Sequence, residues 1–180
     1  MAESLADFNK FLELQPGEKP GHWKRGISLY YAGKFKDGKE QFESYEKVDT
    51  NDVENAVWHY ICNARAVGPE KARAALLKIG KDQRVPMMEV YALFAGKAKP
   101  ADVLAAAKAD DPPAAQLKTR LFYAHLYLGI YHDILGDQKQ ALEHMTEAAE
   151  KYRIGHYMGD RKSTRLNSSH IQKSRMPSSA

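Results

Sequence analysis

The sequence has a single cysteine, Cys62, among 180 residues, which excludes a disulfide within the chain. It also has no apolar run of the roughly 20 residues that a membrane-spanning helix needs, and its N-terminus lacks the basic and apolar segments of an export signal. We therefore expect a chain without a membrane span, cytoplasmic as written. A signal or lipid anchor encoded upstream would move the protein out of the cytoplasm.

Most of the chain has no excess of positive or negative charge. The formal net charge is +4, but five of the 27 basic residues and one of the 23 acidic residues lie in residues 160–180. Residues 1–159 therefore carry 22 basic and 22 acidic side chains, a balance that gives no net attraction for phosphate. We expect no nucleic-acid partner, and an RNA-binding helical repeat is the least favoured interpretation.

Residues 160–180 differ in composition from the rest of the chain. They are rich in Ser, Arg and Lys and show almost no apolar periodicity, which is typical of a disordered segment. In one reading frame they also resemble the translation of a short-read sequencing adapter, with residues 171–173 at the place of a sample index. We therefore predict a disordered, non-native tail at 160–180, from a metagenomic or transcript fragment, and a helical domain over residues 1–159.

Two windows of the remaining chain share one spacing of small and large residues. The first contains Gly26, Gly33, Gly38, Phe42 and Tyr45, and the second contains Gly129, Gly136, Ala141, Met145 and Ala148 at the same offsets. A small residue lets two helices approach, a glycine forms the turn that ends the first helix, and the later residues pack the second helix on the first. The spacing therefore predicts two similar antiparallel helix pairs.

Two further helix pairs are predicted between these windows. Residues 52–80 indicate a helix, a turn at Gly68 and a second helix that begins with a proline, which suits the first helical position. Residues 85–113 indicate a short helix, a turn at Gly96 and a helix that opens at Pro100 and stops before a pair of prolines.

These pairs resemble the tetratricopeptide repeat, a helix–turn–helix unit of about 34 residues. Gly33 and Gly136 are 103 residues apart, one more than three such repeats. The resemblance implies an all-α fold of about nine or ten helices over residues 3–154, with antiparallel pairs stacked as a right-handed α-solenoid. A helix predicted at residues 3–14 would be the second helix of a repeat that has no first helix, so we expect a truncated N-terminus.

The same resemblance implies a concave groove lined by the first helix of each pair. Over residues 5–159 the chain is similar to a group of tetratricopeptide proteins from bacteria and plastids, some of them exported or lipid-anchored. The groove positions carry Trp23, Ile27, Tyr30, Tyr31, Trp58 and Arg65. Most aromatic residues of the chain should pack in the core, but those that project into the groove should supply contact area for a partner, and an arginine could hold a carboxylate. We expect a protein-binding scaffold that holds a peptide or helix of a partner, with no reaction.

Histidines and carboxylates support the main alternative, an unrecognised enzyme with a pocket around His132, Asp133 and Glu89. Metal ligands on one helix need a spacing of three or four, whereas His125 and His132 are seven apart. The sequence also lacks a nucleophile elbow and a phosphate-binding glycine loop. We therefore expect no catalytic residue, no metal and no cofactor.

Overall fold

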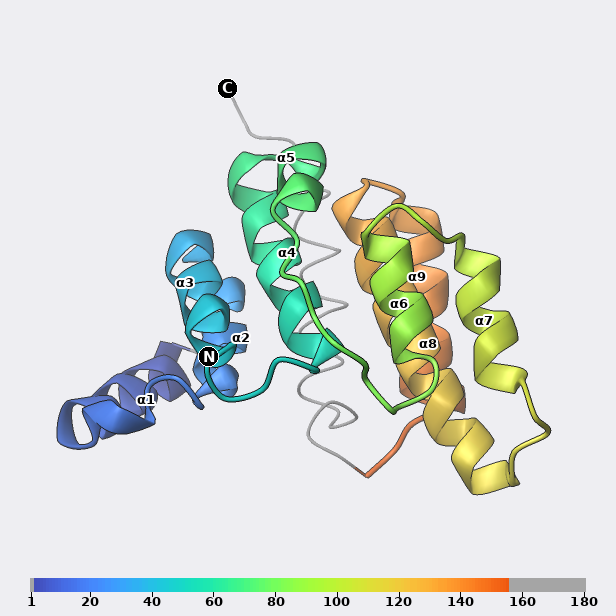
Figure 1. Ribbon diagram of the computed structural model, residues 1–180, viewed down its shortest axis with the longest axis horizontal. Coiled ribbons are helices and arrows are strands. Elements are labelled where there is room, and N and C mark those ends of the chain that lie inside the picture. The colour runs from blue at the N-terminus through green and yellow to red at the C-terminus, as the bar shows by residue number, and fades with distance from the viewer. Residues whose placement is uncertain (1, 156–180) are drawn as a thin grey trace. The chain divides into compact units, whose positions relative to one another are not determined.

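A computed structural model describes residues 2–155 of the chain. These residues form nine α-helices and two short helical turns, and they contain no β-strand (Figure 1). The predicted all-α fold is confirmed for this part of the chain. The predicted tail at 160–180 lies outside the described residues. Within residues 2–155, no helix combines the length and the apolar character that crossing a bilayer requires.

The described residues divide between Gln83 and Arg84 into two compact units, unit 1 before the division and unit 2 after it. Unit 1 contains α1 (Ala2–Leu14), the 3₁₀ turn η1 (Pro16–Glu18), α2 (Trp23–Tyr31), α3 (Phe35–Tyr45), α4 (Val53–Val67) and α5 (Pro69–Ala74). Each α-helix of this unit packs on the next one in the chain, and α2 also contacts α4 (Figure 1). The predicted N-terminal helix is therefore present as α1.

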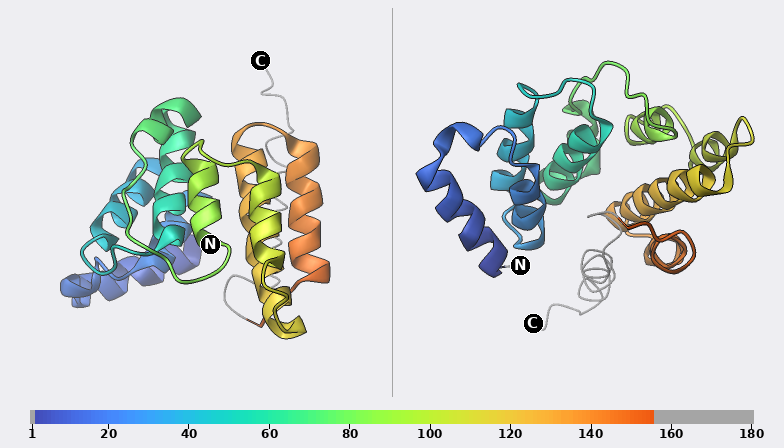
Figure 2. Two further views of the ribbon diagram at one scale, coloured as in Figure 1. Left: turned by 45° about the vertical axis from the view of Figure 1, so that its right-hand side comes forward. Right: turned by 90° about the horizontal axis from the view of Figure 1, so that it is seen from below.

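Unit 2 contains α6 (Met87–Phe94), α7 (Pro100–Lys108), α8 (Ala114–Ile134), α9 (Gln138–Thr146) and the π-helical turn η2 (Glu147–Lys151). The long helix α8 contacts α6, α7 and α9, and η2 packs on both α8 and α9 (Figure 2). α8 is therefore the helix around which the described part of this unit is built.

Four helices end at the four glycines that the sequence predicted as turns. Gly33, Gly68, Gly96 and Gly136 have φ angles between 74° and 93°, in the region that favours glycine. At three of them the next residue donates its N–H to the carbonyl five residues earlier: Lys34 to Leu29, Lys97 to Ala92 and Asp137 to His132, at 2.8–2.9 Å. After Gly68 comes Pro69, which has no N–H and instead opens α5. All four predicted turns are confirmed.

The two similar windows of the sequence produce the same contact between helices. A Cβ added to Gly26 of α2 would lie 2.5 Å from Phe42 Cζ of α3, and one added to Gly129 of α8 would lie 2.8 Å from Met145 Cγ of α9. In each pair the large residue follows the turn glycine by nine positions and fills the space that the small residue leaves. The offsets therefore correspond to one packing arrangement used twice.

The pair formed by α4 and α5 differs from the prediction. α5 ends at Ala74, and residues 75–86 form no helix, although a second helix was expected to continue toward residue 80. This segment instead returns to the start of α4, where the Asp82 carboxylate accepts the N–H of Val53 at 3.2 Å and Gly80 donates to the carbonyl of Thr50 at 2.9 Å. A carboxylate at a helix N-terminus satisfies a free backbone donor and complements the helix dipole, which favours this path.

Candidate functional site

An aromatic cluster lies where α2, α3 and α4 meet. The Trp58 ring of α4 contacts Tyr30 and Tyr31 of α2 edge-on, with centroid distances of 5.7 and 6.3 Å, and stacks on Phe42 of α3 at 6.2 Å. Edge-to-face and offset-stacked rings are the preferred aromatic geometries, and each pair adds about 0.5–1.5 kcal/mol beyond its buried area. The cluster therefore joins three helices of unit 1 and fixes the rotamers of its members.

Arg65 lies beside this cluster in the last turn of α4. Its Nε donates to the Tyr30 hydroxyl at 3.2 Å, which places a permanent positive charge next to the aromatic rings. A cation in the last turn also complements the negative end of the helix dipole. Arg65 is half-buried, and its hydrogen bond to Tyr30 holds its side chain beside the cluster.

The structure separates the six predicted groove residues into two sets. Ile27, Tyr30 and Trp58 are at most 6 % exposed and belong to the core. Trp23, Tyr31 and Arg65 are half-buried. The first set lies in the core because α2, α3 and α4 pack over these side chains. The repeat register assigns both sets to the same helix faces. How deeply each side chain is buried depends on the packing of the helices, which the register does not contain.

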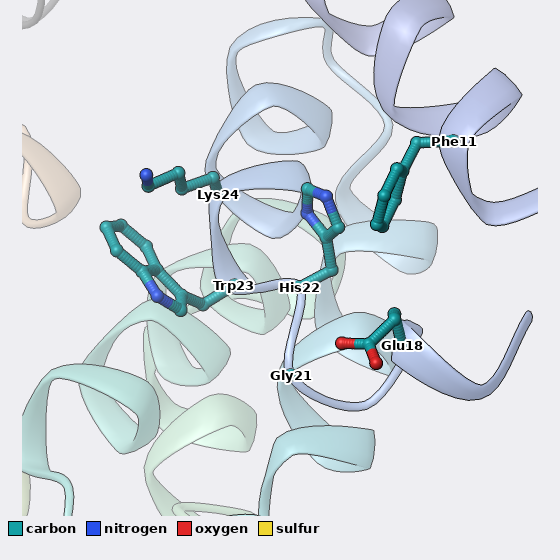
Figure 3. A pocket seen from close by; sticks show the side chains of 6 residues that line it. All are labelled: Phe11, Glu18, Gly21, His22, Trp23 and Lys24. Carbon is teal, nitrogen blue, oxygen red and sulfur yellow. The ribbon is translucent and has the colours of Figure 1, made fainter. Parts of the chain in front are cut away.

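Trp23 also lines a pocket of about 260 Å³ between the end of α1, η1 and the start of α2 (Figure 3). Phe11, Glu18, Gly21, His22, Trp23 and Lys24 line it. Figure 3 shows the Trp23 and Lys24 side chains on one side of the His22 ring, with Phe11 and Glu18 on the other. Lys24 Nζ lies 5.5 Å from the Trp23 ring centroid, a cation–π distance. Sequence reasoning missed the other lining residues because most of them precede α2, and the repeat pattern does not reach that segment.

The structure gives partners for two of the three residues of the enzyme alternative, His132 and Asp133. His132 Nδ1 lies 3.7 Å from Asp137 Oδ2, at the start of α9. Asp133 is buried and accepts a hydrogen bond from the side-chain amide of Gln138 at 3.2 Å. Glu89 belongs to a different helix, α6. The structure therefore brings the Asp137 carboxylate, from the start of α9, close to His132.

Three histidines of unit 2 come together across α8 and α9. His125 Nδ1 and His144 Nδ1 are 3.0 Å apart, and the His132 and His144 rings stack with their centroids 5.6 Å apart. His144 thus contacts both histidines of α8, which lie two helical turns apart. Within residues 2–155, no group of three or more His, Cys, Asp or Glu residues is arranged to hold a metal ion. For His132 and His144 this agrees with their nearly parallel rings, because lone pairs that lie in two parallel planes do not converge on one point.

No model of a known protein family matches the chain. Over residues 2–155 the structure is that of an all-α protein in which glycine turns join helix pairs.

Proposed function

We propose that the chain is a protein-binding scaffold of the tetratricopeptide type, and that unit 1 holds a peptide or helix of a partner protein. The surface we assign to this role is the α2–α4 face, defined by Trp23, Tyr31 and Arg65. Trp23 and Tyr31 are eight residues apart, about 2.2 turns, so their side chains leave α2 in directions about 80° apart. Arg65 reaches the same helix through its hydrogen bond to Tyr30.

The observation that carries this proposal is the rigid support beneath the half-buried residues. Tyr31 lies against the rings of Tyr30 and Trp58, and the Tyr30 hydroxyl holds Arg65. Side chains fixed before binding lose little rotamer entropy in a complex, which saves about 0.5–1.5 kcal/mol for each one. Tryptophan, tyrosine and arginine are also the residue types that contribute most to the binding energy at protein interfaces. The α2–α4 face therefore combines suitable residues with preorganisation.

The wider architecture is part of the same proposal. The helix pairs, the glycine turns and the repeated contact of a small with a large residue support a tetratricopeptide arrangement. We infer that the pairs stack as a right-handed solenoid, in which first helices form the inner surface. In such an arrangement α2 and α4, which contact one another, are consecutive first helices.

A selection from a random peptide library on the immobilised full chain tests this function, with the unfolded chain as the background. Affinities of the enriched peptides are then measured by fluorescence anisotropy for the wild type and for Trp23→Ala, Tyr31→Ala and Arg65→Ala. We expect each variant to weaken binding by about tenfold or more, since a hot spot contributes about 2 kcal/mol.

Tyr45→Ala is the matched control, because Tyr45 is also half-buried in unit 1 but lies at the end of α3. It should leave the affinity unchanged. Peptides that bind all three variants as tightly as the wild type would place the binding surface elsewhere. If no peptide is enriched above the background, the proposed function is wrong.

A further inference from the structure

The hydrogen bond between His125 and His144 depends on how many protons the two rings carry. Their two Nδ1 atoms face one another at 3.0 Å, a hydrogen-bond distance that requires one N–H donor and one lone pair. The neutral pair meets this requirement when one ring carries its proton on Nδ1 and the other on Nε2. If both rings become imidazolium ions, two N–H groups and two positive charges face each other, and the hydrogen bond is lost.

Neighbouring groups add to this effect. Burial and the facing His144 lower the pKa of His125 to about 4, and burial and the stacked His132 lower the pKa of His144. Lys108 of α7 and Lys151 of η2 act in the same direction on His125. The carboxylates that oppose these shifts are Glu147 of η2, which acts on both rings, and Glu143 of α9, which acts on His144. α6 also packs on α8, but among the described residues it provides none of these charges.

The same pair of histidines supports the segment that follows α9. The Tyr152 ring stacks on His125, with a centroid distance of 5.2 Å and an interplanar angle of 21°. Tyr152 directly follows the π-helical turn η2, which packs on both α8 and α9. Its ring therefore contacts α8 through the face of the same imidazole that pairs with His144.

We propose that His125, His144 and Tyr152 form an acid-sensitive clasp, which holds η2 on α8 when the histidine pair is neutral and releases it when both imidazoles are protonated. This clasp is a device of unit 2 and does not depend on the binding role proposed for unit 1. The exposed, released state accepts protons more readily than the closed state does, because it has neither the burial nor the facing charge.

The direction of the pH effect follows from proton linkage. The pKa of His125 is about 4 in the closed state, below the ordinary value of about 6.5 in an unfolded chain. The clasp is therefore fully stable above pH 6.5, and it weakens as the pH falls from 6.5 toward 4. Burial also lowers the pKa of His59 in unit 1. A pH titration of global stability would mix the two effects, so the test needs a signal from η2 itself.

Hydrogen exchange of the full chain, measured by mass spectrometry and corrected for intrinsic rates, gives that signal. We expect amide exchange in residues 147–155 to increase about tenfold or more between pH 7.5 and 5.0, relative to exchange in residues 121–134 of α8. His125→Phe keeps a ring for Tyr152 to stack on but removes the proton, and His144→Phe removes the facing charge. Both variants should reduce the increase to less than about twofold.

His22→Phe is the matched control, because His22 has the same position before its turn glycine as His125 but contacts Phe8 and Phe11 of α1. It should show the wild-type increase in residues 147–155. A wild-type chain with equal exchange at both pH values would overturn the proposal, as would an unchanged increase in His125→Phe.

Nuclear magnetic resonance of the wild-type imidazoles keeps the proposal testable even if a variant does not fold. The signals of His125 and His144 should titrate together, with a first step below the ordinary histidine pKa. Two independent titrations at ordinary values would show that the rings do not share a proton, and the clasp would be refuted.

Discussion

The helix pairs α2–α3 and α8–α9 share one turn and one packing contact, but other positions of the two pairs carry different side chains. Both end their first helix at a glycine with positive φ, and both place a large residue of the second helix against a glycine of the first. Each pair has a histidine eleven residues before its turn glycine, His22 in the first and His125 in the second. Eight residues after the turn glycine the first pair has Gln41, whereas the second has His144. The spacing that forms the pair therefore leaves the neighbouring positions free for other roles.

The consequences of this freedom appear at Gln41 and His144. Gln41 accepts a hydrogen bond from Arg25 at 3.0 Å and donates to the carbonyl of Lys19, so it connects α3 to α2 and to the segment before it. His144 faces His125 instead and creates a contact that responds to protonation. One position of the repeat is thus structural in unit 1 and titratable in unit 2.

Trp58→Ala should have the largest effect on stability, because it removes the centre of the aromatic cluster that joins α2, α3 and α4. Truncating a buried tryptophan costs about 3–5 kcal/mol of the free energy of unfolding. Urea titration of the full chain measures this loss. Trp23→Ala is the control of the same residue type and should cost clearly less, since Trp23 is half-buried. Equal losses would show that the two tryptophans do not differ in structural role.

Ala141→Leu tests the α8–α9 pair in the same way and should have the next largest effect. Ala141 is completely buried in α9, five residues after the turn glycine. A larger side chain there must displace its neighbours, which costs about 1–3 kcal/mol of the free energy of unfolding. A urea midpoint equal to that of the wild type would mean that α8 and α9 do not approach as closely as the repeat spacing requires.

Gly26→Ala and Gly129→Ala compare the two pairs directly and should have the smallest effects. The new Cβ meets the rigid ring of Phe42 in the first pair and the flexible side chain of Met145 in the second. Alanine also favours a helix over glycine by about 1 kcal/mol, which offsets part of the strain. We expect a loss of about 1–2 kcal/mol for Gly26→Ala and less than about 1 kcal/mol for Gly129→Ala. The reverse order, measured by urea titration, would contradict the packing described for these glycines.

The sequence alone determined the features that depend on local chemistry. The four turns were predicted because positive φ requires glycine, and the starts of α5 and α7 because proline suits the first helical position. The matching offsets around Gly33 and Gly136 predicted which small and large residues meet, since these contacts lie within one helix pair and follow from helical geometry.

Only the tertiary structure decided the contacts that depend on how helices rotate against one another. Tyr30 and Trp58 share a helix face with Trp23 and Arg65 in the repeat register, yet the packing of α2, α3 and α4 buries the first two and leaves the others partly exposed. After the early end of α5 the chain returns to the start of α4, where the Asp82 carboxylate accepts the N–H of Val53, 29 residues earlier in the sequence. His144 meets His125 because α9 folds back along α8 with that side inward, and spacing within a single helix carries no information about this approach.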